Sequence, residues 1–166
     1  MSESPGELAH EATLLERGVR LLHLERDPDG AIAAMSEYND RYPKGALTEE
    51  ARVILIEALL ERGRTAEALV VLHDIQPQNA ARGRDLTALR GELLGRAGRC
   101  SEALADFVMV LRVEVGDPAE ERAIVGRATC RASAGDFAGT DDDLASYLVR
   151  FPNGRFAGSV RRTLHR

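Results

Sequence analysis

With 166 residues, the chain has the length of one ordinary domain and can bury roughly 70% of its unfolded surface. Its formal net charge of -5 argues against a dedicated nucleic-acid-binding protein, which needs a basic surface to displace counterions from phosphates. Tryptophan is absent, aromatic residues make up only 4%, and alanine, leucine, arginine and glutamate dominate the rest. These residues favour helices, so the composition predicts an all-α fold.

The first predicted helix begins near Pro5 and ends before residues 27–28. Its expected core side chains recur at helical spacing: Leu8, Ala12, Leu15, Val19 and Leu22. A second helix ends at residues 43–45, where proline and glycine stop it. A third helix, about residues 47–62, is apolar almost all round, which predicts a place in the middle of the structure.

A short helix through residues 68–75 is expected to break at Pro77, and further helices follow at about 85–97 and after Gly98. Asp117 is predicted to cap the next helix, with Pro118 at its first position and Glu120 completing a capping box.

After Gly135, four large apolar side chains are expected to face inward: Phe137, Leu144, Leu148 and Phe151. Neighbouring residues on a helix point about 100° apart, so the run Asp141, Asp142 and Asp143 cannot converge on one cation. We expect a solvated helix N-terminus there. A last short helix follows near residues 156–164.

A repeat organises these elements. The sequence Gly-Arg-Thr-Ala-Glu-Ala-Leu at residues 63–69 returns 35 residues later as Gly-Arg-Cys-Ser-Glu-Ala-Leu at residues 98–104. A weaker copy follows 37 residues further on, and the same step back from residue 63 falls on a turn at residue 26. A period of this length indicates a helical repeat array. The equivalent small residues are Ala31, Ala68, Ala103 and Thr140.

These motifs resemble the tetratricopeptide repeat (TPR) family, whose repeats are antiparallel helix pairs of about 34 residues. The resemblance implies one TPR-like α-solenoid, a superhelix of helix pairs, over residues 1–166. Its four pairs would cover about residues 5–45, 46–80, 83–117 and 118–154, with a C-terminal capping helix at 155–166. The chain departs from the family pattern in lacking its tryptophan. The aromatic-Pro-x-Gly endings at residues 42–45 and 151–154 also look like those of bacterial envelope-associated repeat proteins.

The resemblance implies a non-catalytic scaffold or adaptor that binds a peptide or helix of another protein in its concave groove. The alternative is a regulatory or envelope-complex assembly subunit that acts by self-association or through its convex face. Carrying the family's ligand-facing positions along the repeat gives a first set of Arg20, Glu57, Glu92 and Thr129. A second set, four residues further on, is Leu24, Glu61, Arg96 and Ser133. The glutamates favour a partner segment that carries lysine or arginine.

The sequence predicts no enzyme, because none of its four histidines lies beside a recognisable nucleophile. The cysteines Cys100 and Cys130 are too few for a disulfide framework and lack the spacing of metal ligands. We expect them near each other in adjacent repeats, as free thiols, with no metal or other cofactor. No apolar run reaches the roughly 18 residues of a membrane span, and residues 1–7 show no leader. The expected location is therefore cytoplasmic, or periplasmic if a leader has been removed.

Overall fold

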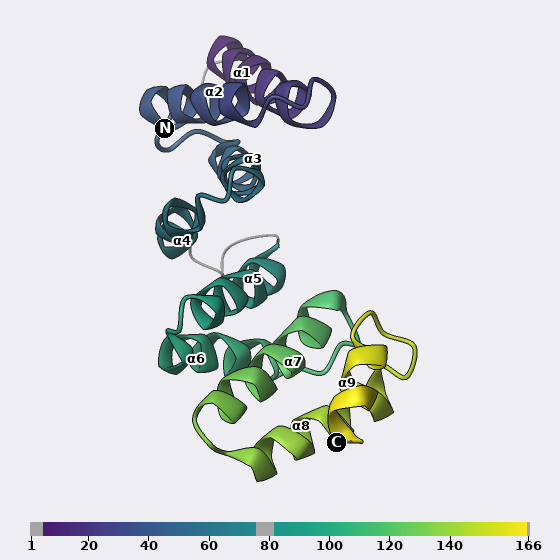
Figure 1. Cartoon of the computed structure of the whole chain (residues 1–166). Helices are drawn as coiled ribbons and strands as arrows, with labels where there is room; N and C mark the ends of the chain where they lie inside the picture. The colour runs from purple at the N-terminus through teal and green to yellow at the C-terminus, as the bar shows by residue number, and fades with distance from the viewer. Residues whose placement is uncertain (1–4, 76–81, 166) are drawn as a thin grey trace. The chain divides into compact units, whose positions relative to one another are not determined.

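The computed structural model describes residues 5–75 and 82–165, and these residues form nine α-helices (Figure 1). Backbone packing divides the chain into two compact units, residues 1–75 and residues 76–166. Helices joined by a short turn pack side by side, so the expected all-α fold of sequential antiparallel pairs is confirmed. The break expected at Pro77 lies outside the described residues. One array spanning both units stays a prediction.

Unit 1 contains α1 (Pro5–His23), α2 (Pro28–Arg41), α3 (Thr48–Glu61) and α4 (Thr65–Asp74). The α1 helix packs against α2 and α3, α2 packs against α3, and α3 packs against α4. The α2 helix has a capped start, because Asp27 Oδ1 accepts a hydrogen bond from Gly30 N at 2.9 Å. The central position predicted for the apolar α3 is confirmed within this unit.

Unit 2 contains α5 (Gly83–Arg96), α6 (Cys100–Val110), α7 (Pro118–Ser133), α8 (Phe137–Arg150) and α9 (Ala157–Leu164). The α5, α6 and α7 helices pack against one another, α7 packs against α8, and α8 packs against α9. Asp117 caps α7 as predicted, accepting Glu120 N at 2.8 Å. The buried Glu120 side chain reaches further back than a capping box requires. It accepts the amides of Val115 and Gly116, each at 2.8 Å.

The four turns inside the helix pairs share one backbone conformation. Each contains a residue with positive φ: Arg26 (55°), Gly63 (70°), Gly98 (76°) and Gly135 (81°). These residues are 37, 35 and 37 positions apart, which confirms the predicted equivalence of the turns. Glycine adopts this left-handed conformation without strain, whereas arginine does not. Five residues after each one, the predicted small side chain is buried: Ala31, Ala68, Ala103 and Thr140.

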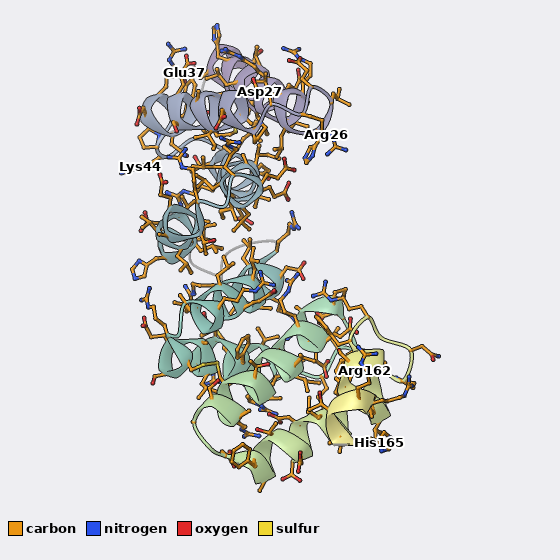
Figure 2. All side chains as sticks on the ribbon, viewed as in Figure 1. Arg26, Asp27, Glu37, Lys44, Arg162 and His165 are labelled. Carbon is orange, nitrogen blue, oxygen red and sulfur yellow. A yellow bond between two sulfur atoms is a disulfide. The ribbon has the colours of Figure 1, made fainter. Side chains whose placement is uncertain are left out.

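The turn between α1 and α2, which contains Arg26 and Asp27 (Figure 2), is one residue longer than the other three. Asp27 N donates to Leu21 O, six residues back, whereas the equivalent amides of the other turns donate to a carbonyl five residues back. Equivalent residues of α1 and α3 are therefore 38 positions apart, and not 37. Gly18 accordingly lies at the close helix crossing, where an added Cβ would collide with the Met35 side chain.

The core face predicted for α1 is wrong in part. Leu8 and Val19 are 44% and 37% exposed, and the side of α1 that is fully buried carries Glu11, Gly18 and Leu22. The error has a physical cause, because the buried side includes a glutamate and a glycine, which apolar spacing does not identify.

The inward position predicted for Phe137 is also wrong, since this side chain is 69% exposed. Phe137 is the first residue of α8, directly after a turn. Its equivalent in the preceding pair, Cys100, is bonded to the first helix of the next pair.

A buried glutamate and a tyrosine join the two helices of the first pair of unit 1. The Tyr38 hydroxyl donates to Glu11 Oε2 at 2.5 Å, and the same oxygen accepts Leu47 N at 3.2 Å. Burial, together with this hydrogen bond, raises the pKa of Tyr38 above its usual range. The contact therefore ties α1 and α2 to the start of α3.

Unit 2 repeats this arrangement, with the tyrosine 109 and the glutamate 110 residues later. The Tyr147 hydroxyl donates to Glu121 Oε1 at 2.5 Å and accepts Phe156 N at 2.9 Å. The pKa of Tyr147 is raised to about 12, mainly by burial and secondly by the hydrogen bond to Glu121. We call each set of three residues a clasp: Glu11, Tyr38 and Leu47 in unit 1, and Glu121, Tyr147 and Phe156 in unit 2. Each clasp positions the helix that follows the pair.

Candidate functional site

The predicted ligand-facing residues of unit 1 lie on α1 and α3. Glu57 is half-buried on α3, and Glu61 is exposed near the end of that helix. Arg20 is exposed on α1, and its Nε contacts Glu25 Oε1 at 3.0 Å. His23 contacts α3 instead, with its Nε2 3.5 Å from Glu57 Oε2.

The longer turn before α2 explains this difference. With a step of 38 residues, Val19 and His23 are the α1 equivalents of Glu57 and Glu61, whereas a step of 37 gives Arg20 and Leu24. The sequence contains no glycine at this turn that would have shown the extra residue.

In unit 2, Glu92 is the centre of a small charge cluster. Its Oε1 is 2.6 Å from Arg96 Nη2 on the same helix, and its Oε2 is 2.8 Å from Arg122 Nε on α7. Arg122 was not among the predicted residues, although it stands opposite Glu92 across two neighbouring first helices. Thr129 is exposed on α7, where its hydroxyl donates to Val125 O at 2.9 Å. Two guanidinium groups therefore compensate the charge of Glu92.

The predicted set is thus divided between the units. Glu57 and Glu61 belong to unit 1, and Glu92, Arg96 and Thr129 belong to unit 2. A common groove through all of them stays a prediction.

Two arginine–aspartate pairs bind the helices of unit 2 to each other. Asp106 of α6 is 4% exposed and accepts Arg90 Nη2 of α5 at 2.6 Å. Asp143 of α8 is 3% exposed and accepts Arg127 Nη2 of α7 at 2.6 Å. The two arginines are 37 residues apart in sequence, and so are the two aspartates, so the same contact occurs in both helix pairs. Paired, buried charges of this kind hold helices in register and are not free for binding.

The solvated helix start predicted for the aspartate run at 141–143 is therefore only partly correct. Asp141 and Asp142 are exposed, but Asp143 faces α7, where Arg131 Nη1 also approaches it at 3.0 Å. A short-range pattern places all three carboxylates alike, whereas the arginines that bury Asp143 come from another helix.

The two cysteines form a disulfide between α6 and α7, so the predicted free thiols are wrong and the predicted proximity is right. Cys100 begins α6, Cys130 lies in the last turn of α7, and their Cα atoms are 5.3 Å apart. That separation is within the range that a disulfide requires. The bond joins the second helix of one pair to the first helix of the next.

Within residues 5–75 and 82–165, no group of three or more histidine, cysteine or acidic side chains could hold a metal ion. Across the same residues, no helix is long and apolar enough to cross a membrane.

These features define a class of protein: an all-α chain of sequential antiparallel helix pairs with TPR-like turns. No family model matches the sequence, and no curated protein matches it. A crystal structure of a tetratricopeptide repeat protein from Parabacteroides merdae ATCC 43184 is similar, at 16% sequence identity and a TM-score of 0.46. The match covers 93% of this chain and 72% of that chain.

Proposed function

We propose that this protein is a non-catalytic interaction module that holds a peptide or helix of another protein against the first helices of its pairs. The observation that carries the proposal is the accessible charge where neighbouring first helices meet. Glu57 beside His23 is 39% exposed, and Glu92 beside Arg122 is 25% exposed. Buried Asp106 and Asp143, by contrast, serve only to hold helices together.

The two units would then offer different chemistry to a partner. In unit 1, Glu57 and Glu61 favour a segment with lysine or arginine, as the sequence predicts. In unit 2, Arg96 and Arg122 flank Glu92, so this surface presents both signs of charge. We expect modest affinity that weakens with salt, because these groups are partly solvated. The proposal includes no cofactor and no nucleic acid.

The alternative function, a subunit of an envelope complex, has one observation in its favour. Disulfides persist in oxidising compartments such as the periplasm and are rare in the cytoplasm. The bond between Cys100 and Cys130 therefore supports the periplasmic rather than the cytoplasmic expectation. Stacking of copies through α9 is not favoured, because Arg162 and His165 (Figure 2) give its outer side a polar character.

The test is a double charge reversal, Glu57→Arg with Glu92→Arg, in the full oxidised chain. Capture of the native partner from its own cells should be lost while helical circular dichroism is retained. Glu67→Arg with Glu102→Arg is the matched control, because it makes the same charge change on the second helices. Normal capture by the first variant, or equal loss with the control, would contradict binding on the first helices.

A further inference from the structure

The α1 helix carries an apolar stripe that the packing of unit 1 covers only in part. The stripe consists of Leu8, Ala12, Leu15 and Val19, which recur at i, i+4, i+7 and i+11 and therefore share one side of the helix. Leu8 is 44% exposed, Val19 is 37% exposed, and the other two are half-buried. Because the fully buried residues of α1 are Glu11, Gly18 and Leu22, the exposed part of the stripe is available to something outside the unit.

The neighbouring α3 helix carries an acidic row on its equivalent side. The row consists of Glu50, Glu57 and Glu61, at i, i+7 and i+11. Glu50 and Glu61 are exposed, and the Glu57 side chain is 39% exposed. The 38-residue step makes Val19 equivalent to Glu57, so the stripe and the row lie on the same side of successive first helices.

Direct contact shows that the two features adjoin. The α1 and α3 helices pack against each other, and His23, one turn after Val19, reaches Glu57 at 3.5 Å. Unit 1 therefore presents an apolar strip with a line of carboxylates beside it.

We propose that this surface binds an amphipathic segment of a partner protein, with apolar side chains on the stripe and lysine or arginine side chains on the acidic row. The inference rests on the proposed function and specifies the chemistry of the partner. Apolar residues three to four positions apart match the spacing of the stripe, as in recognition of a helix in a groove. The basic residues are complementary in charge to the carboxylates of the row.

Charge also decides against two other occupants. A second copy docked through the same surface would bring another row of carboxylates to the rim of the interface, where like charges repel. An anionic lipid surface would be repelled by the same carboxylates.

The test uses three labelled synthetic peptides of about 18 residues, a length that spans about 27 Å as a helix. The probe peptide has leucines at i, i+4, i+7 and i+11 with lysines on both flanks. One control peptide replaces the lysines by glutamate, and the other replaces the leucines by serine. Fluorescence anisotropy with the full oxidised chain should show the probe binding at least about tenfold more tightly than either control.

Two variants assign the binding to the surface. Leu8→Glu with Val19→Glu should weaken the probe at least about tenfold, and Glu57→Gln with Glu61→Gln should weaken it and reduce its salt dependence. The matched control, Val70→Glu with Val149→Glu, alters two valines that are 65% and 83% exposed on second helices and should leave binding unchanged.

Three results would overturn the inference: no binding of the probe at about 100 μM protein, unchanged binding by the Leu8 and Val19 variant, or equal loss with the valine control. A dimer in sedimentation analysis that the Leu8 and Val19 variant abolishes would also overturn it, in favour of a second copy. If that variant captures the native partner normally while the charge-reversal variant at Glu57 and Glu92 does not, only this inference fails. If both of these variants capture the native partner normally, the proposed function itself is wrong.

Discussion

Replacing Tyr147 by phenylalanine removes a single oxygen atom from the clasp of unit 2. The ring can stay in place, because its contacts with Phe151 and Phe156, at centroid distances of 5.6 and 6.3 Å, do not involve the hydroxyl. Two hydrogen bonds are lost. Glu121, which is 8% exposed, loses its donor at 2.5 Å, and Phe156 N loses its acceptor at 2.9 Å.

The size of the effect follows from these two orphaned groups. A buried polar group left unsatisfied costs about 1–3 kcal/mol, and the Phe156 amide is only partly buried, so the sum is about 2–4 kcal/mol. In a cooperative domain of about 60–100 residues, each kcal/mol lowers the Tm by about 4–8 °C. Tyr147→Phe should therefore lower the melting temperature of unit 2 by about 8–30 °C.

Thermal denaturation followed by circular dichroism, together with urea denaturation, measures this change in the full chain. Tyr42→Phe is the matched control, because the Tyr42 ring contacts Tyr38 at 5.6 Å while its hydroxyl takes no part in the clasp of unit 1. It should change the free energy of unfolding by no more than about 0.5 kcal/mol. The reasoning is refuted if Tyr147→Phe is as mild as this control.

Tyr147→Phe should also change how stability depends on alkaline pH. The pKa of Tyr147 is about 12 in the folded chain and near 10 in the unfolded chain, so its contribution is complete below about pH 10. As the pH rises from about 10 to 12, that contribution is lost. Stability of the wild type should fall over this interval, and Tyr147→Phe should show a smaller fall.

Three further outcomes are expected. Asp106→Ala leaves the partly buried Arg90 guanidinium unpaired and should cost about 2–4 kcal/mol in urea denaturation, whereas Asp141→Ala, at an exposed position, should cost no more than about 0.5 kcal/mol. Thiol titration of the unfolded chain should find no reactive cysteine before reduction and both Cys100 and Cys130 after it, and the reduced form should be less stable by about 3–4 kcal/mol. A hydrogen bond from Arg84 holds the pKa of Asp117 below its usual range, so the contribution of Asp117 to stability is present above about pH 4 and is lost as the pH falls further. Asp117→Asn should lower stability at pH 7 and make stability depend less on acid pH.

The repeated turns show why much of the fold could be predicted from the sequence. Gly63 and Gly98 mark positions where the backbone needs positive φ, and the alanines five residues later mark the helix crossings. Both requirements are local, so they leave a direct trace in the sequence. The same pattern correctly predicts the turn at Gly135 in the weaker copy, although few of the neighbouring residues are retained there.

The errors arise where a residue's environment is set by a distant partner. Glu11 was assigned to no core position because a carboxylate normally stays in water, yet a tyrosine 27 residues away allows its burial. The preference of carboxylates for a helix start predicts Asp143 in solvent, but arginines of α7 cover it. Arg26 occupies the turn position that glycine marks in the other pairs, so the sequence does not show the additional residue in this turn. The predicted site residue Arg20 is therefore one position away from Val19, the true equivalent of Glu57.

The bond between α6 and α7 also has a mechanical consequence. Cys100 and Cys130 are 30 residues apart in sequence, and force applied to the chain ends would pass directly across the disulfide between them. The enclosed segment, about 30 residues at about 3.3–3.6 Å each, would withhold about 100 Å of contour length from full extension. A single oxidised molecule stretched between its ends should thus stop about 100 Å short of the length that the reduced molecule reaches. All of α6 and most of α7 would remain inside a closed loop when the chain is stretched, whatever the fate of the rest of the chain.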